Sequence, residues 1–296
     1  MINKMKTNKK TFRNVAIFSF IAVICGWIGV GVNNLLGEPS NLESPGALIF
    51  IATPLLCTIL LRLFGGDGWK DLPIKPNFKQ NTYWYLLAFA IYPVVIGVTL
   101  FFGNLMGWAD ASKFSIVAYL PIFAAAFWPE FIKNIFEESV WRAYLTNQLL
   151  KLKLSDLKLY LLIGFIWWIW HLPYIMIFLS ESEIQNTLPV GRLTFFLIGT
   201  IVVTCWTVMY TEIFRVTKSM WPLVIMHTME DAVINPLLLL GIVSVEKNQA
   251  FLFSLSVGII PTILYLIVGL AVRNWRKKQE KQSKKESGIP FIIGNK

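Results

Sequence analysis

The sequence has little charge and few groups that commonly carry out chemistry. Only 15% of its 296 residues are Asp, Glu, Lys or Arg, whereas 55% are hydrophobic. An ordinary soluble domain has about 25% charged residues, so this composition excludes that class. The three cysteines, Cys25, Cys57 and Cys205, all lie in apolar blocks and are odd in number. A disulfide framework is therefore not expected, and we interpret them as small core residues.

The sequence instead contains long apolar blocks. A helix of about 20 apolar residues can cross a bilayer. Five blocks contain no Asp, Glu, Lys, Arg or His, namely residues 14–37, 44–61, 80–109, 193–211 and 248–272. Three further blocks are interrupted by ionisable residues, namely 114–150, 159–180 and 219–241. The first block is too long for a signal peptide and lacks a cleavage site, so we read it as an uncleaved span. The sequence predicts an all-α polytopic membrane protein with about eight transmembrane helices and a single integral membrane domain over residues 1–296.

The net charge of +10 follows membrane topology rather than a nucleic-acid-binding surface. Twenty-two of the 27 Lys and Arg residues fall in the two ends of the chain and in alternate connections, and three fall in the others. By the positive-inside rule both termini are then cytoplasmic, and termini on the same side require an even number of spans, which agrees with eight. We predict basic cytoplasmic tails at 1–13 and 273–296, the second of which could also rest on anionic lipid headgroups. The short loops and Lys-rich tails favour a bacterial plasma membrane, with a eukaryotic endoplasmic-reticulum membrane as the alternative, and no nucleic-acid partner is expected.

The ionisable residues inside three of the blocks are the informative part of the sequence. Each such residue at mid-membrane costs about 2.5 to 3.5 kcal/mol unless it is paired or hydrated, so their number predicts a polar cavity. Both histidines of the chain belong to this set. The set comprises Glu130, Lys133, Glu137, Glu138 and Arg142 in the fourth block, His171 in the fifth, and His227, Glu230 and Asp231 in the seventh.

Spacing suggests which of these residues meet. Glu137 and His171 are equidistant from the turn near residue 154, so they lie at the same depth if the fourth and fifth spans are antiparallel. His227 and Asp231 are spaced i, i+4 and share one helix face. We therefore expect both histidines and both of these carboxylates in one pocket.

The same spacing argument separates the two adjacent glutamates. Glu138 and Arg142 have the i, i+4 order that favours a helical ion pair, which assigns Glu138 a structural role. Glu137 points about 100° away from that pair, free to act as a general base on water. Glu130 and Lys133, spaced i, i+3, are interpreted as a helix-packing ion pair. The aromatic cluster of Phe165, Trp167, Trp168 and Trp170 is interpreted as lipid-facing and packing surface, with part of a substrate groove as the alternative.

Three motifs carry a resemblance to a known family. Residues Glu137 to Arg142 match the pattern EExxxR, Trp167 to His171 match FxxxH with Trp in place of Phe, and His227 to Asp231 match HxxxD. In this order the motifs resemble those of the CPBP family of intramembrane endopeptidases, over roughly residues 114–240. That family includes the type II CAAX prenyl endopeptidases and the Abi-type proteins linked to bacteriocin self-immunity.

The resemblance implies hydrolysis of a peptide bond in a membrane-associated protein or peptide. Glu137 and His171 would activate a water, His227 and Asp231 would stabilise the oxyanion, and Glu138 and Arg142 would support them. Because an ionised carboxylate repels an oxyanion, Asp231 must be protonated or must orient His227, and we favour the second role.

Other mechanisms and functions stay open at this point. Glu137, His171, His227 and Asp231 could together hold Zn²⁺, although the chain lacks the HExxH signature. We favour the metal-free glutamate mechanism, with no cofactor. A catalytically silent immunity or scaffold protein is one alternative function. An ion transporter is another, disfavoured by the absence of internal repeats.

Overall fold

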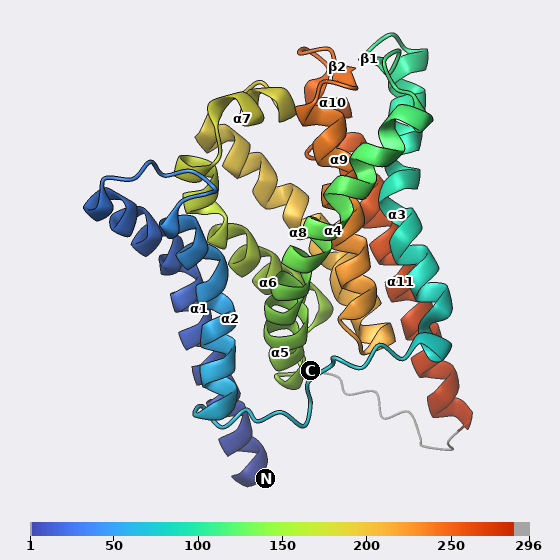
Figure 1. Cartoon of the computed structure of the whole chain (residues 1–296). Helices are drawn as coiled ribbons and strands as arrows, with labels where there is room; N and C mark the ends of the chain where they lie inside the picture. Colours follow the sequence, from blue (N-terminus) through green and yellow to red (C-terminus); the bar gives the residue numbers. More distant parts are fainter. Residues whose placement is uncertain (1, 287–296) are drawn as a thin grey trace.

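The computed structural model describes residues 2–286 as a bundle of helices (Figure 1). Met1 and residues 287–296, which include the end of the predicted C-terminal tail, lie outside the described residues. The long helices are α1 (Ile2–Leu36), α2 (Pro45–Leu63), α3 (Phe78–Leu105), α4 (Ile116–Val140), α6 (Asp156–Trp170), α8 (Arg192–Thr217), α9 (Trp221–Leu239) and α11 (Ile259–Glu286). The short elements are α5 (Asn147–Lys151), α7 (Glu181–Thr187), α10 (Ala250–Phe253), two π-helical segments η1 (Trp141–Thr146) and η2 (Tyr174–Phe178), and strands β1 (Ala109–Asp110) and β2 (Ser244–Val245).

The helical fold is confirmed, and the predicted number of about eight spans is roughly consistent with the structure. Among residues 2–286, seven helical segments are long and apolar enough to cross a membrane, and each falls on one of the predicted blocks. The eighth block forms α9, which has 19 residues, of which fourteen are buried. Its polar residues lower its hydropathy, but they face the protein interior rather than lipid. The last block is shorter than predicted, since α10 and a turn precede α11.

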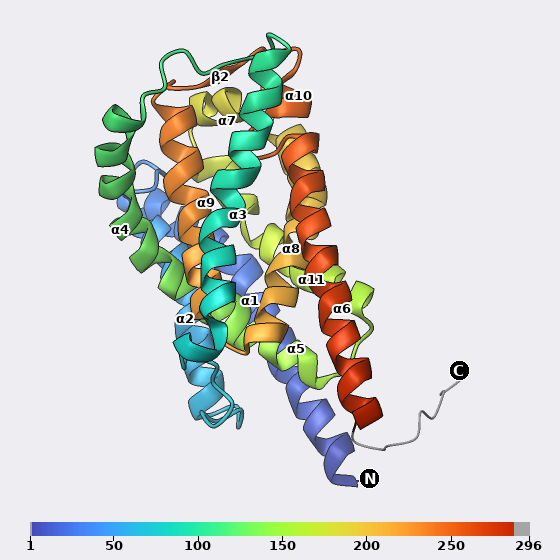
Figure 2. The same cartoon turned by 90° about the vertical axis from the view of Figure 1, so that its right-hand side faces the viewer.

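The packing of the bundle places α9 at its centre. Helix α9 packs between α3 and α4, while α8 packs against α6 and α11, and the α1–α2 hairpin contacts the remainder through α6 and α4 (Figures 1 and 2). Outward side chains such as Leu193 and Ile201 are 64% and 68% exposed. Apolar side chains exposed in this way are suited to contact with lipid. The protein is an integral membrane protein.

The two ends of the bundle differ in their connections. The beginning of α1 and the end of α11 lie at the same end, as an even number of crossings requires (Figure 1). At the opposite end β1 pairs with β2 in antiparallel register, with Ala109 opposite Val245. This two-stranded ladder ties the loop after α3 to the loop after α9. The basic segments predicted as tails continue α1 and α11 as helix in the part of the chain that the structure describes.

Two helices widen into π-helical turns directly after residues of the sequence motifs. Segment η1 follows Glu138 and contains Arg142, and the Thr146 hydroxyl donates to the carbonyl of Trp141 five residues earlier, at 2.7 Å. Segment η2 follows Pro173, which cannot donate a backbone hydrogen bond. Gly26 of α1 lies against Pro173, and a Cβ at that position would collide with the proline ring. Turns of this kind are frequent at functional sites.

Candidate active site

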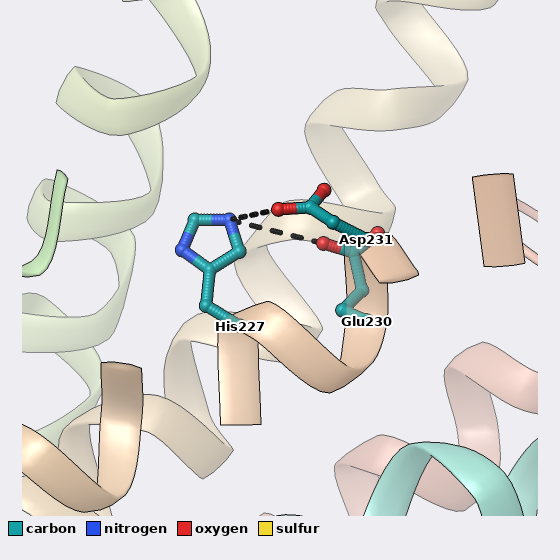
Figure 3. Close-up of side chains that lie close together, drawn as sticks. All are labelled: His227, Glu230 and Asp231. Carbon is teal, nitrogen blue, oxygen red and sulfur yellow. Dashed lines mark ion pairs between the residues drawn. The ribbon is translucent and has the colours of Figure 1, made fainter. Parts of the chain in front are cut away.

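Helix α9 carries three ionisable residues on one face. Nε2 of His227 lies 3.8 Å from Oε2 of Glu230 and 3.9 Å from Oδ2 of Asp231, and all three side chains are nearly buried (Figure 3). The proximity of His227 and Asp231 expected from their i, i+4 spacing is confirmed. Glu230, three residues from His227, was not assigned a role from the sequence, although its i, i+3 spacing was the available signal.

The other nitrogen of His227 contacts the first motif. Nδ1 of His227 lies 3.0 Å from Oε1 of Glu138, and Oε2 of Glu138 lies 3.3 Å from Nε of Arg142. Glu138 and Arg142 are fully buried, so the predicted ion pair between them is confirmed. Because an ionised carboxylate only accepts, Nδ1 of His227 donates to it. Glu138 thus fixes the orientation of His227, and Nε2 is left facing Glu230 and Asp231.

Aromatic rings hold this chain of contacts in place. The Arg142 guanidinium carbon lies 4.4 Å from the ring centre of Trp167 and 4.5 Å from that of Tyr210. The same two rings meet His227 edge-on, with centroid distances of 5.8 and 5.9 Å. Trp167, Trp168 and Trp170 are buried and only Phe165 is exposed. The lipid-facing interpretation is therefore wrong for the three tryptophans, which pack around the site.

Asp231 is bound by two residues of α4. Nζ of Lys133 lies 2.9 Å from Oδ2 of Asp231 and 2.6 Å from Oε2 of Glu130, and the Asn134 amide donates to Oδ2 of Asp231 at 2.8 Å. The predicted pair of Glu130 and Lys133 is confirmed, but it is more than a packing contact within one helix. Lys133 bridges two helices, and with Asn134 it surrounds the Asp231 carboxylate with donors. Neither contact could be inferred from spacing, because α4 and α9 are far apart in the chain.

His171 ends α6 and is held by its own helix. Nδ1 of His171 lies 2.8 Å from the carbonyl oxygen of Trp167. A carbonyl oxygen can only accept, so Nδ1 carries the proton and Nε2 of a neutral ring is free to accept one. The ring centre of Trp170 lies 4.7 Å from that of His171. This geometry fixes the tautomer that a proton-accepting histidine needs.

Glu137 faces a small pocket between α2, α4 and the end of α6. The pocket is lined by Glu137, Trp141, Trp170 and four apolar residues, and its volume is about 10 Å³. That volume is close to the minimum that one water molecule occupies. Within residues 2–286, Glu137 makes no ion pair or hydrogen bond through its side chain, so it is the unpaired carboxylate that the spacing predicted. Trp170 lines the same pocket as Glu137 and also contacts His171. The two helices were expected to form an antiparallel pair, but α4 packs mainly against α9 rather than α6.

The metal-ligand set proposed from the sequence is not the one that the structure groups together. The ligand atoms of His227, Glu230 and Asp231 lie within 4.8 Å of one another, while Glu137 and His171 are not part of this group. The Asp231 oxygen nearest to His227 is also the oxygen that contacts Lys133 and Asn134. A metal ion bound there would have to displace or repel the Lys133 ammonium. The geometry therefore fits a metal poorly.

A comparison with protein families matches the part of the chain that contains the site. A model described as type II CAAX prenyl endopeptidase Rce1-like matches residues 118–233. The chain carries a domain of this family. The Rce1-like domain runs from α4 to α9 and contains all three sequence motifs, with both histidines and the polar residues of the site. Comparison with curated proteins gives no match. Over residues 118–233 the chain is therefore similar to membrane proteases of the CAAX endopeptidase type.

Proposed function

We propose that the Rce1-like domain hydrolyses a peptide bond in a membrane-anchored protein or peptide by a metal-free glutamate mechanism. The observation that carries this proposal is the pairing pattern of the buried groups. The Glu138 carboxylate contacts Arg142 and His227, and the Asp231 carboxylate contacts Lys133 and Asn134. Glu137 has no such partner and lies beside a pocket about the size of one water molecule. An unpaired carboxylate is the group able to take a proton from water.

In this mechanism Glu137 accepts a proton from the attacking water, and the free Nε2 of His171 orients or shares that proton. The water oxygen bonds to the carbonyl carbon of the substrate, and the carbonyl oxygen becomes an oxyanion. The C–N bond then breaks, and the amine leaves with the proton that the base had accepted. Protonated His227, held by Glu138, directs Nε2–H toward the oxyanion.

Lys133 removes the difficulty that Asp231 poses for such a site. A bare carboxylate beside His227 would repel the oxyanion, whereas a carboxylate paired with an ammonium group presents little net charge. Lys133 and Asn134 together neutralise and orient Asp231 from α4. In this proposal the pair of Lys133 and Asp231 presents as little net charge as a neutral amide at position 231 would.

The substrate follows from the setting of the site. It lies among membrane-spanning helices, so we propose a substrate that is itself anchored in the bilayer, with prenylated C-terminal peptides first, as the family description suggests. We also place both termini on the cytoplasmic side, because most basic residues lie at that end.

The test is cleavage of defined peptides by purified protein in lipid vesicles. A farnesylated CAAX peptide and an acylated peptide of the same sequence, each with a fluorophore and a quencher, are compared for wild type and Glu137→Gln. We expect the variant to lose about 10² to 10⁴ fold in turnover while inserting and purifying normally. Glu43→Gln, in an exposed loop, is the matched control and should retain wild-type turnover.

Two outcomes would contradict the proposal. Retention of more than about a tenth of wild-type turnover by Glu137→Gln would exclude Glu137 as the base. Failure of the wild type to cleave either peptide would instead favour a silent binding or scaffold protein, with the polar cluster serving to bind a partner.

A further inference from the structure

A second hollow lies at the end of the bundle where α1 begins and α11 ends, well away from His227. It has a volume of about 540 Å³, within the range of sites for small molecules. Its walls come from the loop between α2 and α3, from α5, from the end of α8 and from α11. None of the residues proposed for catalysis lines it.

The hollow is preformed, because its loop wall is tied to the helices behind it. The backbone N–H of Met220 donates to the carbonyl of Pro73 at 3.0 Å, and the indole of Trp221 donates to the carbonyl of Ile74 at 2.7 Å. The Asn147 amide donates to the carbonyl of Asp71 at 2.9 Å. These bonds fix the segment that carries Lys70 and Lys75 relative to α5 and α9, so a ligand would meet an ordered wall.

The walls carry an excess of positive charge, because both of their acidic residues are paired with basic ones. The two acidic groups are both neutralised, since Asp71 pairs with Lys151 and Glu280 pairs with Arg276. Burial would raise the pKa of Asp71, but its bonds to Lys151 and Arg62 hold that pKa below its ordinary value, so the group stays ionised and paired.

Three lysines on the walls are left without such partners. Lys70, Lys75 and Lys218 make no ion pair within residues 2–286, and all three are exposed. Lys218 ends α8 in a left-handed conformation, with φ of 50°, directly beside Arg215. The hollow therefore presents three uncompensated ammonium groups next to two paired guanidinium groups, Arg215 and Arg276.

The hollow lies at the level of a membrane–water interface. The apolar part of α11 ends at Val272, only four residues before Arg276. Trp275 is 45% exposed next to Arg276, and Trp69 is 47% exposed next to Lys70. Tryptophan is enriched at the headgroup level of membranes. The apolar residues Leu72, Leu150 and Phe214 also contribute to the walls, which suits a ligand with an apolar part.

We propose that this hollow is a binding site for a phosphate group, supplied by the headgroup of an anionic phospholipid. Clusters of Lys and Arg bind phosphate groups, and anionic lipid headgroups lie at the level where the interfacial tryptophans place the hollow. Free phosphate offers the same chemistry from solution, and it is separated from lipid in the test. The site is independent of the peptidase activity, and its test requires no substrate.

The experiment measures binding and thermal stabilisation of the purified full-length chain in a neutral detergent. The probes are short-chain phosphatidylglycerol, short-chain phosphatidylcholine and inorganic phosphate. The variant Lys70→Gln/Lys75→Gln/Lys218→Gln removes the three unpaired charges. The matched control Lys158→Gln/Lys278→Gln/Lys281→Gln removes three exposed lysines at the same end of the bundle that do not line the hollow.

We expect phosphatidylglycerol to bind the wild type and raise its melting temperature, and phosphatidylcholine to have little effect. The lining variant should bind phosphatidylglycerol about ten- to a hundredfold more weakly, since each basic residue near an anionic headgroup contributes about one decade or less. The control should stay within about twofold of wild type.

Two other results would assign a different ligand to the hollow or overturn the proposal. Equal binding of inorganic phosphate and lipid, both lost in the lining variant, would assign the site to soluble phosphate. Unchanged binding by the lining variant, or equal loss by the control, would overturn the proposal and reduce the effect to general surface charge. Melting temperatures without ligand verify that each variant is folded.

Discussion

The bridge from Lys133 to Asp231 gives the sharpest test of the proposed site. Replacing Lys133 by Met keeps the length and the apolar stem of the side chain but removes the ammonium group. Asp231 then retains only the Asn134 amide as a donor, at 2.8 Å, and the Glu130 carboxylate loses its partner as well. The carboxylates of Glu130 and Asp231 then lack this cation, and Glu230 lies within 4.8 Å of Asp231 as a third carboxylate.

The size of the effect follows from burial. Removing one partner of a buried ion pair costs about 3 to 5 kcal/mol. The Lys133 side chain is 35% exposed and that of Asp231 is 11% exposed, so the lower end applies, about 3 kcal/mol. If that loss falls on the transition state, turnover drops by more than about a hundredfold. The Asp231→Asn change should be much milder, at about tenfold or less, because it removes one charge of the carboxylate cluster and keeps its shape.

A double-mutant cycle separates a specific pair from two independent effects. Turnover and melting temperature are measured for Lys133→Met, Asp231→Asn and the double variant, with Lys113→Met in an exposed loop as the control. We expect the double variant to be about tenfold or more faster than Lys133→Met, because no unpaired carboxylate is left at position 231. A double variant as slow as Lys133→Met, or slower, would refute the charge-neutralising role of Lys133.

Three further predictions concern neighbouring groups. Glu138→Ala should lower the melting temperature in detergent, since it leaves a buried arginine unpaired, whereas Glu137→Ala should not; equal melting temperatures would contradict the two roles. Turnover of Asp231→Asn should not depend on added Zn²⁺, and an inactive variant rescued by zinc would establish a metalloprotease. Because its pKa is depressed in the folded state, Asp71 stabilises the protein above about pH 4, the unfolded value. This stabilisation should disappear as the pH falls through the folded value, so the melting-temperature gap to Asp71→Asn should shrink as the pH falls below about 4, and a constant gap would disprove it.

The class of fold, and two contacts within single helices, could be predicted from the amino-acid sequence alone. Span-length apolar blocks leave helices as the only economical way to satisfy the backbone in lipid, so eight blocks specify eight helices. Charged residues inside such blocks are costly unless they are grouped, which singles out the nine ionisable residues as one cluster. The i, i+4 spacings within a single helix predicted the contact of Glu138 with Arg142 and that of His227 with Asp231, because the helix alone fixes those distances.

Contacts between groups on different helices depend on how the helices pack. The pairing of Lys133 and Asn134 with Asp231 depends on α4 packing against α9, and that of Glu138 with His227 depends on the same interface. Helix packing angles and π-helical turns shift side chains by several ångströms, and neither is encoded in local spacing. For this reason the sequence could not show that Trp167, Trp168 and Trp170 are buried, nor that Glu230 lies beside His227 and Asp231. The same dependence on packing explains the basic hollow, whose walls come from four segments that are distant in the chain and join only when the bundle closes.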